Sequence, residues 1–227
     1  MVKFSLQAVK YILGELFTKL RRIPGMLLRG VNICYEKARG LDFSGIIQPE
    51  MEGHCAYEAS RGMAAYIMLR AYLCSRVSNN DAIIDIGCGK GRMICFFAKF
   101  AFKKTDGLEY SPELAGIAER NLRRLGINGA EVIRGDASEF EDIDGYNYFY
   151  MFNPFGEAIM KQFVLHLKES ISRTPRKIRV IYRNPVLHPY LLYEGFKVEE
   201  DLRRTLKANK IYNFLWRNMP TIIAYTH

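Results

Sequence analysis

From residue 82 onward the chain alternates short apolar runs with helical patterns, and this alternation constrains its fold more than any other feature. Residues 82–86 form an apolar run that ends in glycines, which is typical of a buried strand. Further strands are predicted at 105–109, 131–134, 146–152 and 178–182, with candidates at 196–202, 211–216 and 221–225. Helices are predicted between them at 92–102, 111–125, 157–170 and 189–194. Such βα alternation predicts a doubly wound α/β fold, a mostly parallel sheet with helices on both faces.

Length, overall composition and cysteine content narrow the class of protein further. A length of 227 residues suits one domain with an appendage, and 49% hydrophobic with 25% charged residues excludes a disordered chain. The five cysteines are odd in number and form no CxxC pair, which argues against a disulfide framework and against a structural zinc site. No uninterrupted apolar run reaches the roughly 18 residues of a membrane span. We therefore expect no metal and a cytoplasmic protein.

The N-terminal part has the pattern of a basic amphipathic helix and not the strand–helix alternation of the rest. Apolar residues between 9 and 20 recur at helical spacing, with lysines and arginines off the stripe, and Pro24 and Gly25 end the pattern. We predict that residues 1–55 form a basic amphipathic helix and a connector, and that 56–227 form the main domain, beginning with a helix over 56–76. A basic amphipathic helix can make peripheral contact with a membrane. The alternative is that it packs on the main domain or on a second subunit.

Charge is unevenly distributed along the chain. The formal net charge is +9, with net +6 (8 basic, 2 acidic) in residues 1–40 and net +7 (12 basic, 5 acidic) in residues 168–227. The middle of the chain carries net −4 (13 basic, 17 acidic). Basic ends favour a polyanionic partner such as RNA or an anionic membrane surface, although solubility alone explains them as well.

The segment Asp85-Ile86-Gly87-Cys88-Gly89-Lys90-Gly91 lies where a predicted strand turns into a predicted helix. Glycines at such a turn let a ligand approach the main chain, and the helix that follows offers unpaired N–H groups. A dinucleotide fingerprint, G-x-G-x-x-G, would need glycine at Arg92. A phosphate P-loop would need serine or threonine after Lys90, where Gly91 stands.

The pattern D-x-G-x-G-x-G resembles motif I of the class I S-adenosylmethionine-dependent methyltransferases, and the resemblance covers about residues 80–185. Glu109 after the second strand, Asp136-Ala137 after the third and Asn153-Pro154-Phe155 after the fourth agree with the family in order. The resemblance implies a seven-stranded sheet with one antiparallel strand and S-adenosyl-L-methionine as cofactor.

The resemblance also implies roles for individual residues. The cofactor would lie over the loop at Gly87, Cys88, Gly89 and Gly91. A carboxylate at Glu109 can accept from both ribose hydroxyls, and Asp85 offers negative charge to the methionine ammonium. Asp136 would face the adenine, with Ala137 beside it; the alternative is that Asp136 only forms a turn. Tyr57, in the segment before the first strand, is a candidate contact to the methionine end, as are Glu52, His54 and Ser60.

Asn153, Pro154 and Phe155 are the predicted catalytic residues. They look like a shortened (N/D)-P-P-(Y/F) motif, in which amide and carbonyl oxygens accept from a target amino group and the aromatic ring stacks on the acceptor. One proline is missing, so the ring comes one residue early. Asn153 would then face the methyl group; the alternative is a turn that touches only the cofactor. His188, after the fifth strand, is a candidate base, although a lone histidine is more often inert.

We predict a methyltransferase that transfers a methyl group by in-line displacement to an N or O atom of a small-molecule or saccharide acceptor. In such a reaction, positioning provides much of the acceleration, so no catalytic triad is expected. One alternative acceptor is a nitrogen of RNA or protein, favoured by the basic C-terminal residues Arg173, Arg176, Lys177, Arg179 and Arg183. Another is a cofactor-binding partner subunit without turnover.

Overall fold

The computed structural model describes residues 33–47, 55, 57–58, 63–206 and 221–227. Residues 42–227 belong to one compact unit, which contains the sheet. Residues 33–41, considered by themselves, contain a short helix over 33–38. The predicted amphipathic helix of residues 9–20 and the strand candidate at 211–216 lie outside the described residues, and the domain boundary at 55/56 stays a prediction.

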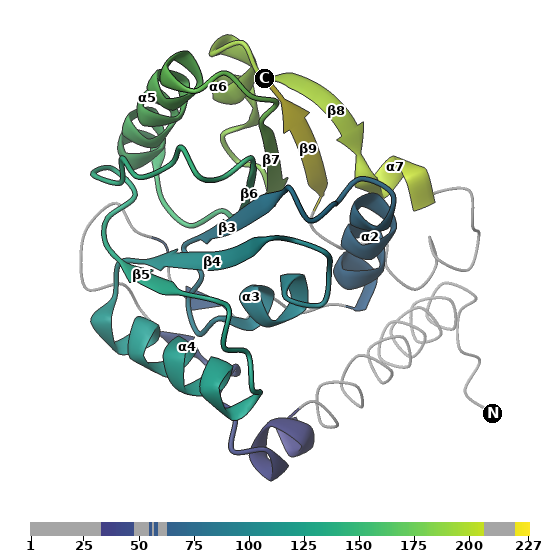
Figure 1. Cartoon of the computed structure of the whole chain (residues 1–227), viewed down its shortest axis with the longest axis vertical. Coiled ribbons are helices and arrows are strands. Elements are labelled where there is room, and N and C mark those ends of the chain that lie inside the picture. Colours follow the sequence, from purple (N-terminus) through teal and green to yellow (C-terminus); the bar gives the residue numbers. More distant parts are fainter. Residues whose placement is uncertain (1–32, 48–54, 56, 59–62, 207–220) are drawn as a thin grey trace, which may run out of the picture. The chain divides into compact units, whose positions relative to one another are not determined.

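A seven-stranded sheet forms the centre of the compact unit (Figure 1), in the order β5-β4-β3-β6-β7-β9-β8. Five strands are parallel: β3 (Ala82–Ile86), β4 (Lys104–Glu109), β5 (Val132–Arg134), β6 (Tyr148–Phe152) and β7 (Arg179–Arg183). The antiparallel strand β9 (Ile222–Thr226) lies between β7 and β8 (Lys197–Asp201). The predicted doubly wound, mostly parallel seven-stranded sheet is confirmed.

Helices connect the strands, and their apolar side chains form two cores. The helices are α2 (Met63–Cys74), α3 (Arg92–Phe97), α4 (Pro112–Arg124), α5 (Glu157–Arg173), α6 (His188–Tyr193) and α7 (Leu202–Leu206). One core joins α5 and α6 to one face of the sheet, and the other joins α2, α3 and α7 to the opposite face. Because side chains alternate along a strand, Tyr148 and Tyr150 of β6 belong to the second core, whereas Phe149 and Met151 belong to the first.

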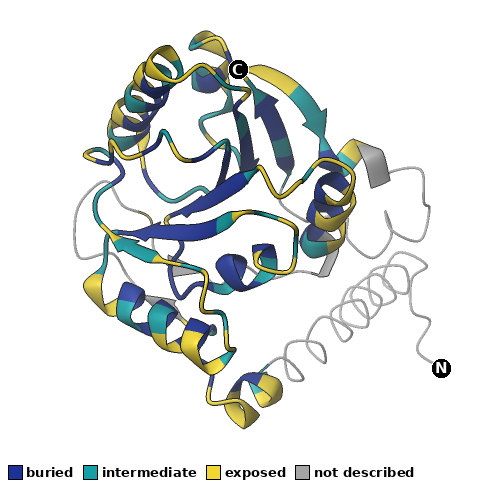
Figure 2. Ribbon diagram, viewed as in Figure 1, coloured by how far each residue is buried: buried dark blue, intermediate teal, exposed yellow. Residues whose placement is uncertain are grey.

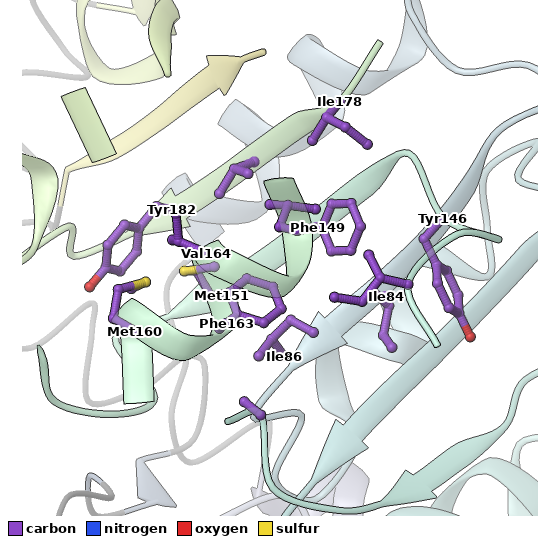
Figure 3. Packing of buried hydrophobic residues seen from close by; sticks show 14 of the residues in the cluster. Ile84, Ile86, Tyr146, Phe149, Met151, Met160, Phe163, Val164, Ile178 and Tyr182 are labelled. Atoms are coloured by element: carbon purple, nitrogen blue, oxygen red, sulfur yellow. The ribbon is translucent and has the colours of Figure 1, made fainter. Parts of the chain in front are cut away.

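Burial follows this layering (Figure 2). All five residues of β3 are buried, while α4 and α5 carry exposed residues on their outer faces. Figure 3 shows the first core from close by, with Phe163 and Val164 of α5 packed against Phe149 and Met151 of β6. A sheet covered on both faces explains why its central strands β3 and β6 appear in the sequence as nearly continuous apolar runs.

Local signals in the sequence set several boundaries. Ser111 is the N-cap of α4 and accepts from the Leu114 N–H at 3.4 Å, with Pro112 in the first turn. Gly126 follows the helix with φ +68°, a conformation that glycine adopts without strain. Both ends of α4 therefore lie where the sequence predicts them.

Two predicted helices are shorter in the structure. Residues 57–58, expected to be helical, form strand β2 (Tyr57–Glu58), which pairs with β1 (Ile46–Ile47), and the described helix α2 is Met63–Cys74, which ends two residues before the expected end at 76. The helix expected over 92–102 ends at Phe97, and Phe100 and Phe102 pack edge-on in an aromatic cluster after its end. In the first case the pairing of Tyr57–Glu58 with Ile46–Ile47 overrides the helical pattern. In the second, the packing of Phe100 and Phe102 on the rings of Phe96 and Phe97 does so.

Among the described residues, no helix is both long and apolar enough to cross a membrane.

Candidate functional site at the carboxyl edge of the sheet

Strand order reverses between β3 and β6, because β4 and β5 lie on one side of β3 while β6 and β7 continue on the other. In doubly wound sheets, ligands bind at the carboxyl ends of the strands at such a switch point. The glycine loop follows β3 and Asn153 follows β6, so both flank this point. The fold therefore places the two strongest sequence motifs side by side.

The glycine loop is held against β4. The N–H groups of Gly87 and Cys88 both donate to the carbonyl of Leu108, at 2.9 and 3.0 Å. Gly87 has φ +74°, and a Cβ placed on it would lie 2.5 Å from the Cβ of Pro154. Only glycine fits there, because the turn is left-handed and the chain after β6 packs directly on it.

Glu109 ties this loop to the start of α4. Its carboxylate accepts from the Gly89 N–H at 2.7 Å through Oε2 and from the Ser111 N–H at 2.9 Å through Oε1. The side chain is buried at the end of β4, where the sequence predicts it. A carboxylate offers about four lone-pair directions, so a group of this kind can accept from more than two donors, ribose hydroxyls among them.

A second buried carboxylate lies beside it. Asp85 is 3% exposed, and burial together with the nearby Glu109 charge raises its pKa well above the usual range. A cationic group bound at this edge would relieve that repulsion. The pair therefore fits a ligand such as S-adenosylmethionine, which carries an ammonium and a sulfonium.

Cys88 is also buried, and burial raises the pKa of its thiol. A thiol of raised pKa is a poor nucleophile, so Cys88 has the character of a packing residue of the loop. Gly107 faces it: a Cβ there would lie 2.6 Å from the Cys88 Sγ.

Asp136 forms a turn after β5. Its Oδ1 accepts from the N–H of Ser138 at 2.8 Å and from the Ser138 hydroxyl at 2.7 Å. Ala137 is buried in the first core. The turn that the sequence analysis held open for Asp136 is thus present, and its adenine contact stays a prediction.

The segment after β6 differs from its expected role at Phe155. Phe155 is 3% exposed and its ring lies 6.3 Å from that of Phe163 in the core, so it is not placed to stack on an acceptor. The missing proline explains this, because it moves the ring one residue back toward the sheet. The expectation of a stacking ring at Phe155 is corrected accordingly.

Asn153 and Pro154 do line the edge. Asn153 is half-buried, adopts φ +43°, and accepts at Oδ1 from the Tyr182 hydroxyl at 3.0 Å. The carbonyl of Pro154 accepts from the Cys55 N–H at 3.0 Å. A residue before the sheet is therefore attached to the segment after β6, and the contact of Tyr57 with the methionine end of the cofactor stays a prediction. Tyr57 lies in β2, but its side chain lies outside the described residues, as do Glu52, His54 and Ser60.

Sequence reasoning missed a set of contacts that holds residues 42–44 over the loop. The Lys90 ammonium contacts the Asp42 carboxylate at 2.6 Å and the Ser44 carbonyl at 2.8 Å. Asn121 of α4 accepts from the Asp42 N–H and donates to the carbonyls of Asp42 and Lys90. No sequence signal links residues 42, 90 and 121, since only the tertiary fold brings them together.

Three further side chains with polar or cationic groups are candidates for contact with an acceptor at this edge. His188 Nδ1 lies 2.7 Å from the Tyr225 hydroxyl, which gives the ring a structural partner. Arg183 ends β7, is 3% exposed and lies over the Phe152 ring at 4.2 Å. Arg92 begins α3, and its guanidinium lies 4.8 Å from the centre of the Phe43 ring. Positive charge therefore lies at the ends of β7 and of the glycine loop.

Comparison with known proteins links this chain to methyltransferases. Residues 83–170 match the sequence profile of a family described as a methyltransferase domain. A protein-lysine N-methyltransferase of Saccharolobus islandicus is 34% identical over 77 residues, 33% of this chain and 48% of the relative. A protein-L-isoaspartate O-methyltransferase of Methanoculleus marisnigri is 33% identical over 63 residues, 28% of each chain. The chain thus spans about half, or less, of the curated relatives it matches.

Solved structures share the fold. A methyltransferase from Aquifex aeolicus superimposes with a TM-score of 0.56 at 10% identity, over 72% of this chain and 91% of that one. A putative methyltransferase from Escherichia coli gives 0.55 at 13% identity, over 74% and 88%. At such identities the likeness concerns the fold alone.

The sheet order and the loop at the switch point define a Rossmann-like, doubly wound protein with a ligand site at its carboxyl edge. The family match over residues 83–170 specifies the class further. Residues 83–170 thus match a methyltransferase domain, and the fold is that of the class I S-adenosylmethionine-dependent methyltransferases, whose cofactor is S-adenosylmethionine.

Proposed function

We propose that this protein is an active methyltransferase that transfers a methyl group from S-adenosylmethionine to an N or O atom of a small-molecule or saccharide acceptor. The observation that carries the proposal is the joining of the glycine loop to two buried carboxylates. Glu109 binds the Gly89 N–H, and Asp85 lies at the end of the neighbouring strand. These groups are arranged for a ligand with adjacent hydroxyls at one end and positive charge at the other.

The cofactor, when bound, supplies an activated methyl group on a sulfonium. The chain contributes positioning. Asp85 would hold the ammonium, Glu109 the ribose, and the loop N–H groups the rest of the ligand. Asn153, beyond the loop at the end of β6, would orient the acceptor in line with the methyl group, and such orientation alone can supply about 7–11 kcal/mol of the barrier.

The basic C-terminal residues that favour RNA in the sequence have intramolecular partners. Arg173 pairs with Asp144, and Arg176 donates to carbonyls after α5 and before β6. Lys177 and Arg179 both contact Glu199. Since these groups stabilise the fold, they support a nucleic-acid acceptor less than their number suggests. A protein nitrogen acceptor is the second candidate, because one relative is a protein-lysine N-methyltransferase.

Isothermal titration calorimetry with S-adenosylmethionine and S-adenosylhomocysteine tests the proposal, with NADH as a control ligand. We expect both sulfur ligands to bind and NADH not to bind. Gly89→Arg should abolish binding, because its side chain would fill the ligand side of the loop, and circular dichroism would show that the variant is folded. Absence of binding to the folded wild-type protein would contradict the proposal and favour the partner-subunit alternative.

We propose separately that residues 1–55 make peripheral contact with a membrane. Co-sedimentation with vesicles of anionic and neutral lipids would test it.

A further inference from the structure

Lys90 belongs to the glycine loop, but its side chain contacts a segment that precedes the sheet. Its ammonium lies 2.6 Å from the Asp42 carboxylate and 2.8 Å from the Ser44 carbonyl oxygen. The Lys90 side chain is only 6% exposed, whereas that of Asp42 is 53% exposed. Burial takes water away from an ammonium, and nearby oxygen atoms compensate for that loss. Residues 42–44 therefore stabilise the buried form of Lys90.

Asn121 of α4 joins the same segment to the backbone of the loop. Its Nδ2 donates to the carbonyls of Lys90 at 3.0 Å and Asp42 at 2.9 Å, and its Oδ1 accepts from the Asp42 N–H at 3.0 Å. Asn121 is 1% exposed. A flipped amide would set its oxygen against two carbonyl oxygens, so these hydrogen bonds fix the amide orientation. The Lys90 carbonyl is thereby held in one direction.

Further contacts follow along the same segment. Phe43 is 6% exposed, and the guanidinium of Arg92, the first residue of α3, lies 4.8 Å from the centre of its ring. Gly45 comes close to the lysine side chain, since a Cβ placed on it would lie 3.7 Å from Lys90 Nζ. Residues 42–45 thus form a brace that packs along the loop and the start of α3.

The loop residues beside Lys90 make the contacts on which the cofactor site depends. The Gly89 N–H donates to Glu109 Oε2 at 2.7 Å, and Glu109 is the predicted ribose ligand. Gly89 has φ +55° and Gly91 has φ +79°. Glycines on both sides of Lys90 leave this stretch with few steric restraints of its own. Its conformation therefore depends on the groups that hold Lys90.

We propose that Lys90 and Asn121 are positioning residues for S-adenosylmethionine. They attach the brace to the glycine loop and so hold the loop in the conformation that binds the cofactor. A loop that takes up this conformation for a fraction of the time binds with an affinity reduced by that fraction. The inference rests on the proposed function and adds residues 42–45 to the groups on which cofactor binding depends.

Thermodynamic linkage makes this effect reciprocal. If the attached brace favours cofactor binding, bound cofactor favours the attached brace by the same factor. The Asp42 N–H reports the attachment because it donates to Asn121, and its proton exchanges with water when that hydrogen bond opens. S-Adenosylhomocysteine should therefore slow the exchange of the Asp42 amide proton.

Amide hydrogen exchange of the ¹⁵N-labelled wild-type protein tests this without any substitution. We expect saturating S-adenosylhomocysteine to slow exchange at Asp42 and to leave Lys103 unchanged. The Lys103 N–H donates to the Asp81 carbonyl at the opposite, amino-terminal edge of the sheet. Unchanged exchange at Asp42, or equal slowing at both positions, would overturn the proposal. Failure of S-adenosylhomocysteine to bind would instead contradict the proposed function.

Lys90→Met provides the second test, because it removes the ammonium and keeps an apolar stem. The Asp42 carboxylate is half-exposed and stays hydrated in this variant, so no buried charge is left behind. We expect the Kd for S-adenosylhomocysteine to rise about tenfold, as for a loop that is in the binding conformation about a tenth of the time. Calorimetry well below the unfolding temperature measures this. A lowered free energy of unfolding with an unchanged Kd would show a merely structural role and overturn the proposal.

Lys99→Met is the matched control, since Lys99 is an exposed lysine just after α3, and its Kd should equal that of the wild type. Asp42→Asn should also raise the Kd. Its combination with Lys90→Met should add little, because both changes remove the same contact. Fully additive effects of the two changes would mean that they act separately, which would overturn the proposed role of the contact.

Discussion

Single carboxylates at the ends of β3 and β4 decide how this protein would hold a cofactor. Asp85 and Glu109 are both buried, and the Glu109 charge contributes to the raised pKa of Asp85. Glu109 keeps its place through two backbone N–H donors, whereas Asp85 lies against a like charge. Glu109 is therefore already stabilised by hydrogen bonds within the protein, whereas Asp85 would be stabilised by a cationic group of the ligand.

The raised pKa of Asp85 predicts a pH dependence of binding. A bound ammonium favours the ionised carboxylate and lowers its pKa, so binding should release a proton. The affinity for S-adenosylhomocysteine should accordingly fall as the pH is lowered toward the raised pKa of Asp85. Calorimetry across a pH series would measure this, and Asp85→Asn should remove the dependence. 5′-Methylthioadenosine, which lacks the ammonium, should bind equally at each pH; a matching dependence for it would contradict the assignment.

Glu109→Ala should weaken S-adenosylhomocysteine binding by more than about 1 kcal/mol, because it removes charge-assisted hydrogen bonds to the loop and to the ligand. Titration calorimetry gives the change directly. Glu113→Ala, which removes an exposed carboxylate in the first turn of α4, is the control. Equal affinity in the Glu109 variant and the wild type would refute the assignment of Glu109.

At the level of elements, the turn from β3 into α3 depends on close packing with the chain after β6. Gly87 meets Pro154, and Gly91, the N-cap of α3 with φ +79°, lies against Ala118 of α4. The site is thus built where three elements approach too closely for side chains between them.

Gly87→Ala should lower the free energy of unfolding by more than about 2 kcal/mol, since alanine is strained at positive φ and its Cβ would overlap Pro154. Urea denaturation would measure the loss. Gly145→Ala is the matched control, because its Cβ meets nothing within 4 Å and its φ is not positive. That variant should be neutral or gain up to about 1 kcal/mol. Similar values for the two variants would mean that the close approach of Pro154 does not matter.

At the scale of the whole compact unit, Glu199 of β8 joins elements from distant parts of the chain. It accepts from the Tyr72 hydroxyl of α2 at 2.6 Å and from Arg179 of β7 at 2.9 Å. Lys177, before β7, lies 3.1 Å away. The C-terminal strand pair is thereby fastened to α2 and to the parallel part of the sheet.

Hydrogen bonds from Tyr72, Arg179 and Lys177 lower the pKa of Glu199 to about 2, against the opposing effect of burial. A lowered pKa in the folded state means that this stabilisation is present above the usual value of 4.5 and is lost as the pH falls from there toward 2. Glu199→Gln should therefore cost about 1–3 kcal/mol at pH 7, and less at pH 3.

Urea denaturation of both proteins at the two pH values would measure this difference. Glu157→Gln, in an exposed pair with Lys161, is the control and should change stability little. A cost for Glu199→Gln that does not shrink at low pH would show that its charge is unimportant.

Much of the fold was predictable because its signals are local. Continuous apolar runs predicted the buried strands, Ser111 and Pro112 predicted the start of α4, and the glycine spacing at 87–91 with Glu109 predicted the cofactor class. Each of these follows from the chemistry of neighbouring residues, and the strand order of a doubly wound sheet then brings the strand ends together.

Tertiary structure alone decided the rest. The contacts of Lys90 and Asn121 with Asp42 join residues far apart in the chain. The β1–β2 pairing and the burial of Phe155 against α5 likewise depend on packing that the local pattern does not contain. The hydrogen bond between Asn153 and Tyr182 is of the same kind, because Tyr182 lies on the next strand. The sequence thus determined which cofactor class the chain is built for. Packing between strands decided which atoms face the site, since a side chain's direction depends on neighbours that the local pattern does not contain.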